Sequence, residues 1–199
     1  MTIDVRRVDY RDPDQARLLG ELLSAYAADS MGRGRALTAE EQRRLGPALA
    51  QRPHAFSLIA YCDGVPAGLA NCLESFSTFA CQPIVNIHDL AVLSDFRGRG
   101  ISQALLGAIE AIAADMNCCK ITLEVLSNNH PAKAAYEKYG FKGYTLDPES
   151  GHALFWEKPL AASWAWPARL PGQDAKKSSS NRARRSGCSS GIQCPPAKP

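Results

Sequence analysis

The chain has 199 residues, of which 45% are hydrophobic, and a formal net charge of +3 at pH 7, which fits one globular domain with an appendage. No run approaches the 18 apolar residues of a membrane span, and the N-terminal residues lack the apolar core of a signal peptide, so we expect no membrane association. The seven cysteines are odd in number and form no Cys-x-x-Cys pair. We therefore expect reduced thiols in a cytoplasmic protein, with neither a disulfide framework nor a bound metal.

Apolar periodicity and turn residues predict the elements of the first half of the chain. Ile3 and Val5 alternate with polar neighbours, which predicts a strand. Thr38 and Glu41 have the spacing of a capping box and predict a helix start. Asp63-Gly64 between two apolar runs predicts a hairpin. The expected ranges are strand Ile3–Val8, helix Asp12–Ala28, loop Ser30–Ala36, a helix from Thr38 to about Gln51, and strands Ala55–Cys62 and Pro66–Ser77.

The second half alternates strands and helices and then ends in two strands. Asn129 and Pro131 suit a helix start, and Gly140 suits its end. The expected ranges are strand Ile84–Leu93, helix Ile101–Met116, strand Lys120–Val125, helix Asn129–Tyr139, and strands Phe141–Leu146 and His152–Lys158. Hairpins combined with crossovers predict an α/β fold, with a mixed sheet of about seven strands and helices on both faces.

The C-terminal residues differ from the rest in charge and composition. From Pro167 onward there are seven Lys or Arg residues and one acid, which leaves residues 1–166 with a net charge of −3. The Ser, Pro and Gly content predicts a disordered tail over residues 161–199, after a domain over residues 1–160. The basic run Lys176–Arg185 could contact nucleic acid or an anionic surface, but a solvated extension explains it more simply. We expect no nucleic-acid partner beyond this tail.

The most informative segment, Arg97-Gly98-Arg99-Gly100-Ile101-Ser102, follows a predicted strand and opens a predicted helix. Glycines let a ligand approach the backbone, and the first N–H groups of a helix have no partner within it, so the segment suits the pyrophosphate of a nucleotide cofactor. The dinucleotide-binding pattern requires a third glycine where Gln103 stands, and the Gly-Lys-Ser/Thr of a P-loop is absent. An ordinary glycine turn with solvated arginines is the alternative.

Two motifs in this order of elements resemble those of the GNAT superfamily of acyl-CoA-dependent N-acyltransferases. The family's pyrophosphate loop, Arg/Gln-x-x-Gly-x-Gly/Ala, is matched by Arg97, Gly100 and Ser102, of which Ser102 departs from the pattern but is small. The second signature, Asn-x-x-Ala-x-x-x-Tyr-x-x-x-Gly-Phe, is matched at every position. Its residues here are Asn129, Ala132, Tyr136, Gly140 and Phe141. The resemblance covers residues 3–160 and implies a GNAT-like fold.

The resemblance implies acetyl-CoA as co-substrate, held where the strand ending near Leu93 and the strand Lys120–Val125 part. The backbone of this strand is then expected to bond the pantetheine amides as an added strand would, through Leu90, Ala91 and Val92. Asn129 is expected to touch the pantetheine arm. The residues expected to wrap the pyrophosphate are Arg97, Gly98, Arg99, Gly100, Ile101 and Ser102.

Acetyl transfer to an amine requires a neutral amine, a stabilised carbonyl oxygen and a proton donor for the departing thiolate, and a backbone N–H near Val92 can stabilise the oxygen. The resemblance assigns proton donation to Tyr136, although a core aromatic would fit the same helix pattern. His88 stands where many family members have Glu, and strict alternation places it opposite Asp89. His88 is therefore the first candidate for the general base and Asp89 the second. A structural histidine, with bulk water as proton acceptor, is the alternative.

The sequence is less informative about the acceptor. Phe76 and Phe79 offer apolar walls and Glu74 and Asp29 could attract a cation, although all four could also be ordinary surface or core residues. We expect a small-molecule primary amine, with a protein amine as a variant, attacking directly in a ternary complex. A non-catalytic acyl-CoA sensor with a basic tail that engages an anionic partner is the alternative. The identity of the amine, an acyl chain longer than acetyl and homodimer formation stay open at this stage.

Overall fold

The computed structural model describes residues 1–144, 149 and 153–158. By its internal contacts the chain divides into two units, residues 1–155 and residues 156–199, and the three described residues of the second unit form no helix or strand. The elements of the first unit are β1 (Ile3–Arg7), α1 (Pro13–Ala28), α2 (Ala39–Leu49), β2 (Ala55–Cys62), β3 (Val65–Ser77), β4 (Gln82–Val92), a 3₁₀ turn (Ser94–Phe96), α3 (Ile101–Asp115), β5 (Ile121–Leu123) and α4 (His130–Tyr139).

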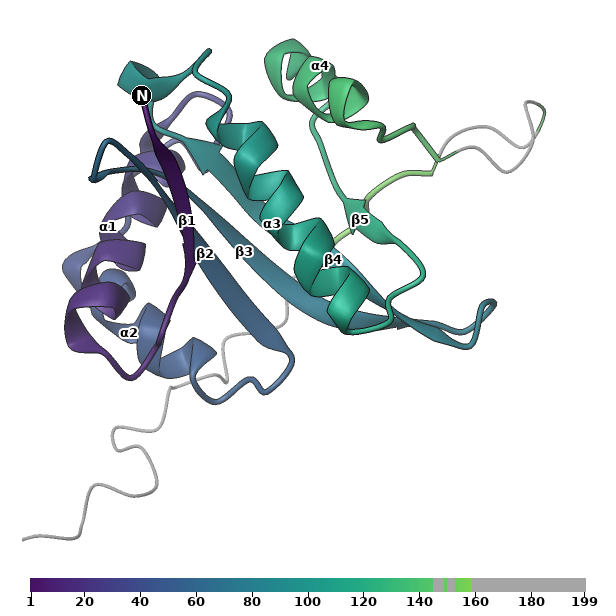
Figure 1. The fold of residues 1–199 in the computed structure, drawn as a ribbon, viewed down its shortest axis with the longest axis horizontal. Helices are drawn as coiled ribbons and strands as arrows, with labels where there is room; N and C mark the ends of the chain where they lie inside the picture. Colours follow the sequence, from purple (N-terminus) through teal and green to yellow (C-terminus); the bar gives the residue numbers. More distant parts are fainter. Residues whose placement is uncertain (145–148, 150–152, 159–199) are drawn as a thin grey trace, which may run out of the picture. The chain divides into compact units, whose positions relative to one another are not determined.

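The five strands form one mixed sheet in the order β1-β2-β3-β4-β5 (Figure 1). The first four strands are antiparallel, and β5 pairs parallel to β4. The predicted hairpin is confirmed: Asp63 (φ 49°) and Gly64 (φ 82°) both have positive φ, as a two-residue turn between twisted strands requires. The parallel strand β5 is reached through the crossover helix α3, as a parallel connection requires.

Helices cover both faces of the sheet, as predicted. On one face, Leu19 and Leu22 of α1 pack with Ile59 and Leu69 of the sheet. On the other face, α3 buries an apolar stripe against β2, β3 and β4, and it can be followed across the strands in Figure 1. The fully buried residues of this stripe are Ile101, Leu105, Leu106 and Ile109. The α/β fold is therefore confirmed, with its larger core between α3 and the sheet.

The described residues form five strands, fewer than the predicted seven or so. Residues 141–144 and 153–158 carry no strand, and the rest of the two expected C-terminal strands, residues 145–146 and 152, lies outside the described part. The two expected C-terminal strands would need the edge of a neighbouring strand to pair with. The edge strand β5 offers only three residues for this pairing, instead of the six expected. The predicted tail, residues 161–199, also lies outside the described residues and stays a prediction.

In the part of the chain that the structure describes, no helix is long and apolar enough to span a membrane. The helix ends follow the sequence closely. Asp12, Thr38 and Asn129 cap α1, α2 and α4 through side-chain oxygens, and Thr38 forms a complete capping box with Glu41. Only α3 among the four α-helices begins without such a bond, a difference that matters at the candidate site.

The packing of α3 gives a first prediction. Replacing the fully buried Leu105 by Ala leaves a cavity beneath the sheet and is expected to lower the free energy of unfolding by about 2–5 kcal/mol. Val65→Ala, at an exposed strand end, is the control and is expected to cost less than about 1 kcal/mol. Urea denaturation of both variants measures the difference. Equal losses in the two variants would show that α3 is not the main packing element.

Candidate active site

The site begins where β4 and β5 separate. The two strands pair only from Val85 with Ile121 to Ile87 with Leu123. After Leu123, β5 ends, whereas β4 continues to Val92, so no strand formed by the described residues pairs with the last five residues of β4 on this side (Figure 1). An unpaired strand edge presents backbone N–H and C=O groups that can bond a ligand as an added strand would.

Backbone alternation shows which residues present these groups. In an antiparallel pair, successive residues direct their N–H and C=O to opposite sides. Leu93 N–H donates to the carbonyl of Ala67 on β3 at 2.9 Å, so Ala91 also faces β3. Leu90 and Val92 therefore face the open edge, and the carbonyl of Val92 already accepts a bond from Arg97 Nε at 3.2 Å. Of the three residues expected at the pantetheine, Leu90 and Val92 carry the available groups.

A β-bulge interrupts β4 at His88. Asn71 pairs with Asp89 and Cys72 pairs with Ile87, so His88 has no partner on β3. Ile87 and Leu90, three positions apart, pack against the same core cluster beneath α3. Strict alternation does not hold across the bulge, and the expected placement of His88 and Asp89 on opposite faces, which assumed it, does not apply.

A cavity of about 230 Å³ lies at the point of separation. It is lined from α1 and the residues after it, from β4, from the segment after β5, and from α4. The lining residues are Tyr26, Met31, Ile87, His88, Leu90, Leu123, Glu124, Val125, Leu126, Asn129, Ala132, Tyr136 and Phe155. Four of the predicted residues, His88, Leu90, Asn129 and Tyr136, therefore come together here, although they are far apart in the sequence. A second cavity of about 220 Å³, beside Arg7, Tyr10 and Arg52, contains none of the predicted residues.

Tyr136 is buried on α4, where its ring packs against Phe141 with 5.9 Å between ring centroids. Burial, together with a smaller contribution from the neighbouring phenol of Tyr26, raises the pKa of Tyr136 to about 12. Among the described residues, no buried side-chain oxygen lacks a hydrogen-bond partner. The Tyr136 hydroxyl has none and is thus accessible from the cavity that its residue lines. The cavity therefore presents a protonated phenol that can donate a hydrogen bond to a ligand.

Asn129 has two functions in this arrangement. Its side-chain oxygen accepts a bond from Ala132 N–H at 3.2 Å and so caps α4. The same side chain lines the cavity. Its position at the first turn of α4 fixes the start of the helix that carries Tyr136.

Sequence analysis gave no role to two ionisable residues that line this cavity. Tyr26 falls within the expected helix Asp12–Ala28, but it lines the cavity, and its pKa is raised by burial and by the charges of Asp89 and Asp29. Glu124 falls within the expected strand Lys120–Val125 but follows the end of β5. Its carboxylate accepts bonds from Asn86 Nδ2 at 3.3 and 3.4 Å and lines the cavity. No motif marks either residue, because both depend on where β5 ends.

Asp89, the second candidate for the general base, is held by a chain of hydrogen bonds that runs through the buried side chains of Asn71 and Ser57. Asn71 Nδ2 donates to Asp89 at 2.9 Å, and Ser57 Oγ donates to the Asn71 side-chain oxygen at 2.6 Å. Because the Ser57 proton is used for Asn71, the 2.8 Å bond between Ser57 and Tyr10 has the Tyr10 hydroxyl as donor. Each group in this chain has a partner, and the chain fixes the carboxylate directly beside the bulge.

The predicted pyrophosphate loop has the geometry of an anion site. Gly98 (φ 76°) and Gly100 (φ 84°) lie in the left-handed region, and Gly100 precedes α3 without a side-chain cap. The first N–H groups of α3 therefore remain available at the positive end of the helix dipole. Arg97 donates to Asp29 at 2.7 Å, and Arg99 stacks over Phe96 at 5.3 Å from the ring centroid.

The four residues considered for the acceptor are not part of the cavity lining, although Asp29 bonds the backbone N–H of the lining residue Met31. None of Phe76, Phe79, Glu74 or Asp29 lines the cavity. Phe76 and Phe79 are exposed near the tip of the β3–β4 hairpin, and Glu74 bonds His54 at 3.2 Å. In residues 1–144, 149 and 153–158, no group of three or more His, Cys, Asp or Glu residues could hold a metal ion.

Comparisons with known proteins agree with this architecture. The model of the acetyltransferase (GNAT) family matches residues 21–141. An N-alpha-acetyltransferase of Saccharolobus solfataricus is 37% identical over 76 residues, which are 35% of this chain and 46% of that protein. An aminoglycoside N(6')-acetyltransferase type 1 of Salmonella typhimurium is 25% identical over 116 residues, or 57% of this chain and 76% of that protein.

Solved structures share the fold. The structure of AAC(6')-Iy in complex with the bisubstrate analogue CoA-S-monomethyl-acetylneamine has a TM-score of 0.62. The match covers 80% of this chain and all of that chain at 20% sequence identity. At this level of identity the likeness establishes the arrangement of helices and strands, and it leaves the acceptor to be argued from the residues of this chain.

The buried phenol gives a prediction of pH dependence. Below pH 10, Tyr136 is protonated in the folded and unfolded states. Between pH 10 and about 12 the unfolded phenol ionises while the folded one does not, so the free energy of unfolding is expected to fall with rising pH by about 1–3 kcal/mol from this group. Tyr136→Phe is expected to flatten this part of the stability profile, whereas replacing the exposed Tyr144 by Phe is not. Parallel slopes for the wild type and Tyr136→Phe would contradict the assignment.

Proposed function

Because the chain belongs to the acetyltransferase (GNAT) family, whose enzyme class is acetyl-CoA-dependent N-acetyl transfer, we propose that it acetylates the primary amine of a small cationic molecule. The amine attacks the thioester directly, with both substrates bound. One observation carries the proposal: the open edge of β4 and the Tyr136 hydroxyl meet at the same cavity. A strand edge suits the pantetheine amides, and a protonated phenol suits the sulfur end.

The residues present fit acetyl-CoA. The backbone groups of Leu90 and Val92 would hold the pantetheine arm, and Asn129 lies on the opposite wall of the cavity. The loop Arg97–Ser102 would hold the pyrophosphate through the uncapped N–H groups of α3, with Arg97 and Arg99 supplying positive charge. Acetyl-CoA supplies the activated acyl group, and the chain supplies orientation and charge stabilisation.

Tyr136 acts best as a hydrogen-bond donor to the departing sulfur. A thiol has a pKa of about 8.5, well below the value of about 12 for Tyr136, so complete proton transfer to the thiolate would be uphill. Donation of a hydrogen bond to the developing negative charge needs no such transfer and is strong in a site shielded from water. The high pKa keeps the donor proton in place at neutral pH.

The amine side of the cavity favours a cation. Its lining includes the carboxylate of Glu124 and no Lys or Arg among the described residues. His88 stands in the bulge and lines the cavity, where it can accept a proton from the bound ammonium so that the neutral amine attacks the thioester. Asp89 adds negative charge near Tyr26. Its hydrogen bond from Asn71 on β3 holds the backbone next to the bulge in place. We propose the cytoplasm as the location, which the free cysteines of the described residues support.

The test is release of CoA thiol from acetyl-CoA in the presence of a panel of primary amines, including aminoglycosides, polyamines, amino acids and N-terminal peptides. Tyr136→Phe is expected to lower kcat by about 10²-fold, since it removes one hydrogen-bond donor from the developing charge. Tyr139→Phe is the matched control, because the Tyr139 phenol lies on the same helix but bonds Glu110 and does not line this cavity. CoA binding without thiol release for any amine would contradict the proposal and favour an acyl-CoA sensor.

A second prediction separates the roles of His88 and Glu124. His88→Ala is expected to lower kcat by about 10²-fold, because it removes the group that accepts the proton of the amine, with a smaller effect on the KM of the amine. Glu124→Gln keeps the bonds to Asn86 in part but loses the charge, and is expected to raise the KM of the amine more than it lowers kcat. An unchanged kcat in His88→Ala, with a lowered one in Glu124→Gln, would reverse the two assignments.

A further inference from the structure

The segment that joins α1 to α2, residues 29–37, forms one wall of the amine side of the cavity. We call it the strap. Tyr26, three residues before it, and Met31 within it both line the cavity. The strap turns back against the end of α1, where Gly32 N–H donates to Asp29 and Arg33 N–H donates to Ala27. A side chain at Gly32 would lie 2.1 Å from the carbonyl oxygen of Tyr26, so the turn requires glycine.

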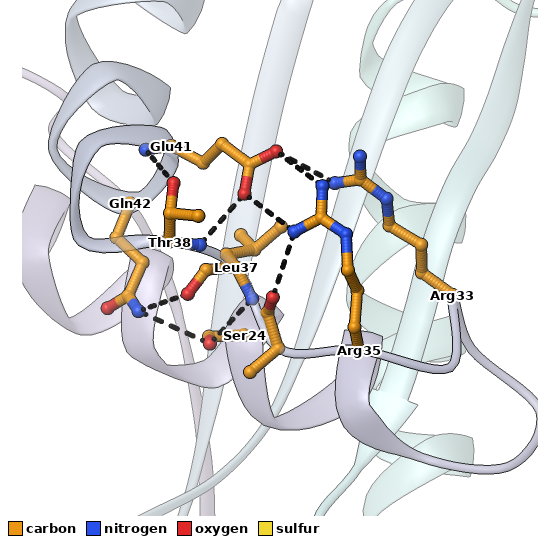
Figure 2. Close-up of polar contacts among 8 residues, drawn as sticks. Ser24, Arg33, Arg35, Leu37, Thr38, Glu41 and Gln42 are labelled. Carbon is orange, nitrogen blue, oxygen red and sulfur yellow. Dashed lines mark hydrogen bonds and ion pairs between the residues drawn. The ribbon is translucent and has the colours of Figure 1, made fainter.

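The far end of the strap is fixed to α2, as Figure 2 shows. The Glu41 carboxylate pairs with Arg33 at 3.0 Å and with Arg35 at 3.2 Å. These bonds, together with the one from Thr38 N–H, hold the pKa of Glu41 far below its usual range. Ser24 Oγ accepts from Leu37 N–H at 3.1 Å, which ties the same end to α1. These contacts of the strap join it to α1 or α2, the two helices that it connects.

The near end of the strap is fixed differently, to the predicted cofactor loop. The Asp29 carboxylate accepts from the N–H of Met31 at 3.0 Å and from Arg97 Nη2 at 2.7 Å. Arg97 is 68 residues away in the sequence and donates its Nε to the carbonyl of Val92 at the open edge of β4. One carboxylate thus holds a residue of the amine wall on one side and the first residue of the cofactor loop on the other.

We propose that Asp29 is a positioning residue that couples the two substrates: through Arg97 it ties the strap, and with it the amine wall at Met31, to the loop that binds the CoA pyrophosphate. The inference rests on the proposed function, because it assumes that Arg97 contacts the cofactor. A guanidinium has five N–H donors, so Arg97 can keep its bonds to Asp29 and Val92 and still offer Nη1 to a phosphate oxygen. Fixing Arg97 through the cofactor therefore fixes the Asp29 carboxylate and the Met31 amide that bonds it.

The ion pair is suited to coupling rather than to stability. The Arg97 side chain is 57% exposed and that of Asp29 is 26% exposed, and such pairs add little to the free energy of folding. A coupling between two binding sites needs only a modest difference, since effects of about 5-fold to 150-fold on affinity are typical. Loss of Asp29 should accordingly change the response of the strap to cofactor without unfolding the protein.

Hydrogen exchange of the full chain with and without CoA tests the coupling. In the wild type, CoA is expected to slow exchange of the amides of residues 30–37, and that of Met31 most directly. In Asp29→Asn, CoA is expected to bind but to leave exchange in the strap unchanged. Glu41→Gln is the matched control: it loosens the far end, so exchange should be faster throughout, yet slowing by CoA should persist. Slowing in Asp29→Asn equal to that in the wild type would overturn the coupling.

Kinetics with the best amine of the panel provide a second measurement. Asp29→Asn is expected to raise the KM of the amine by about 5-fold or more at saturating acetyl-CoA, with kcat changed less, and Asp29→Glu to restore part of the difference. A fall in kcat alone, with KM unchanged, would contradict a positioning role. Absence of CoA binding to the wild type would overturn the proposed function as well, whereas CoA binding with no change in the strap would overturn this inference alone.

Discussion

The rest of the site depends on the loss of strand pairing beside β4. A sheet is stabilised by each backbone hydrogen bond between its strands. Over its last five described residues, β4 is no longer paired with β5. Their groups are left at a partly covered edge, which is costly unless water or a ligand bonds them. Every candidate residue for catalysis is placed by this opening: His88 lies in the bulge at its start, Glu124 lies where β5 ends, and Tyr136 faces it from α4.

The opening persists because both sides of it are fixed by packing and by satisfied polar groups. Behind the bulge, Tyr10, Ser57, Asn71 and Asp89 form a directed chain of hydrogen bonds in which no donor competes with another. Buried polar groups of this kind specify one arrangement, because any shift of register leaves at least one of them without a partner. In front of the opening, the cap at Asn129 and the contact of Tyr136 with Phe141 fix α4. The cavity is thus held open between two rigid walls.

Much of this could be read from the sequence, and the exceptions have a common cause. The hairpin at Asp63-Gly64, the capping box at Thr38 and the helix that begins at Ile101 depend on neighbours within a few residues, and each was predicted correctly. The bulge was missed, although Val85 and Ile87 at odd positions are followed by Leu90 and Val92 at even ones, which is the signature of one extra residue.

No such local signal in the sequence shows where β5 ends. None shows either that Tyr26 and Glu124 line the cavity. A strand ends where its partner is no longer in reach, and this is decided by how α3 and α4 pack against the sheet. Asn129 and Tyr136 were predicted because a motif with fixed spacing carries them, not because periodicity distinguishes a catalytic tyrosine from a core one. Residues that face the amine belong to no such motif, and for them the packing of the whole unit had to be known.

Arg97 shows how one residue can serve several parts of such a site. Its planar guanidinium donates to the carbonyl of Val92 at the open edge and to the carboxylate of Asp29 at the strap. Arg97 is also the first residue of the predicted pyrophosphate loop. A lysine could bind a phosphate at this position, but its single ammonium cannot hold a carbonyl and a carboxylate in fixed directions while doing so. The arginine of the pyrophosphate motif is therefore required here by geometry as much as by charge. The guanidinium of Arg97 thus joins the open edge of β4, the predicted cofactor loop and the strap, and the proposed coupling runs through this one planar group.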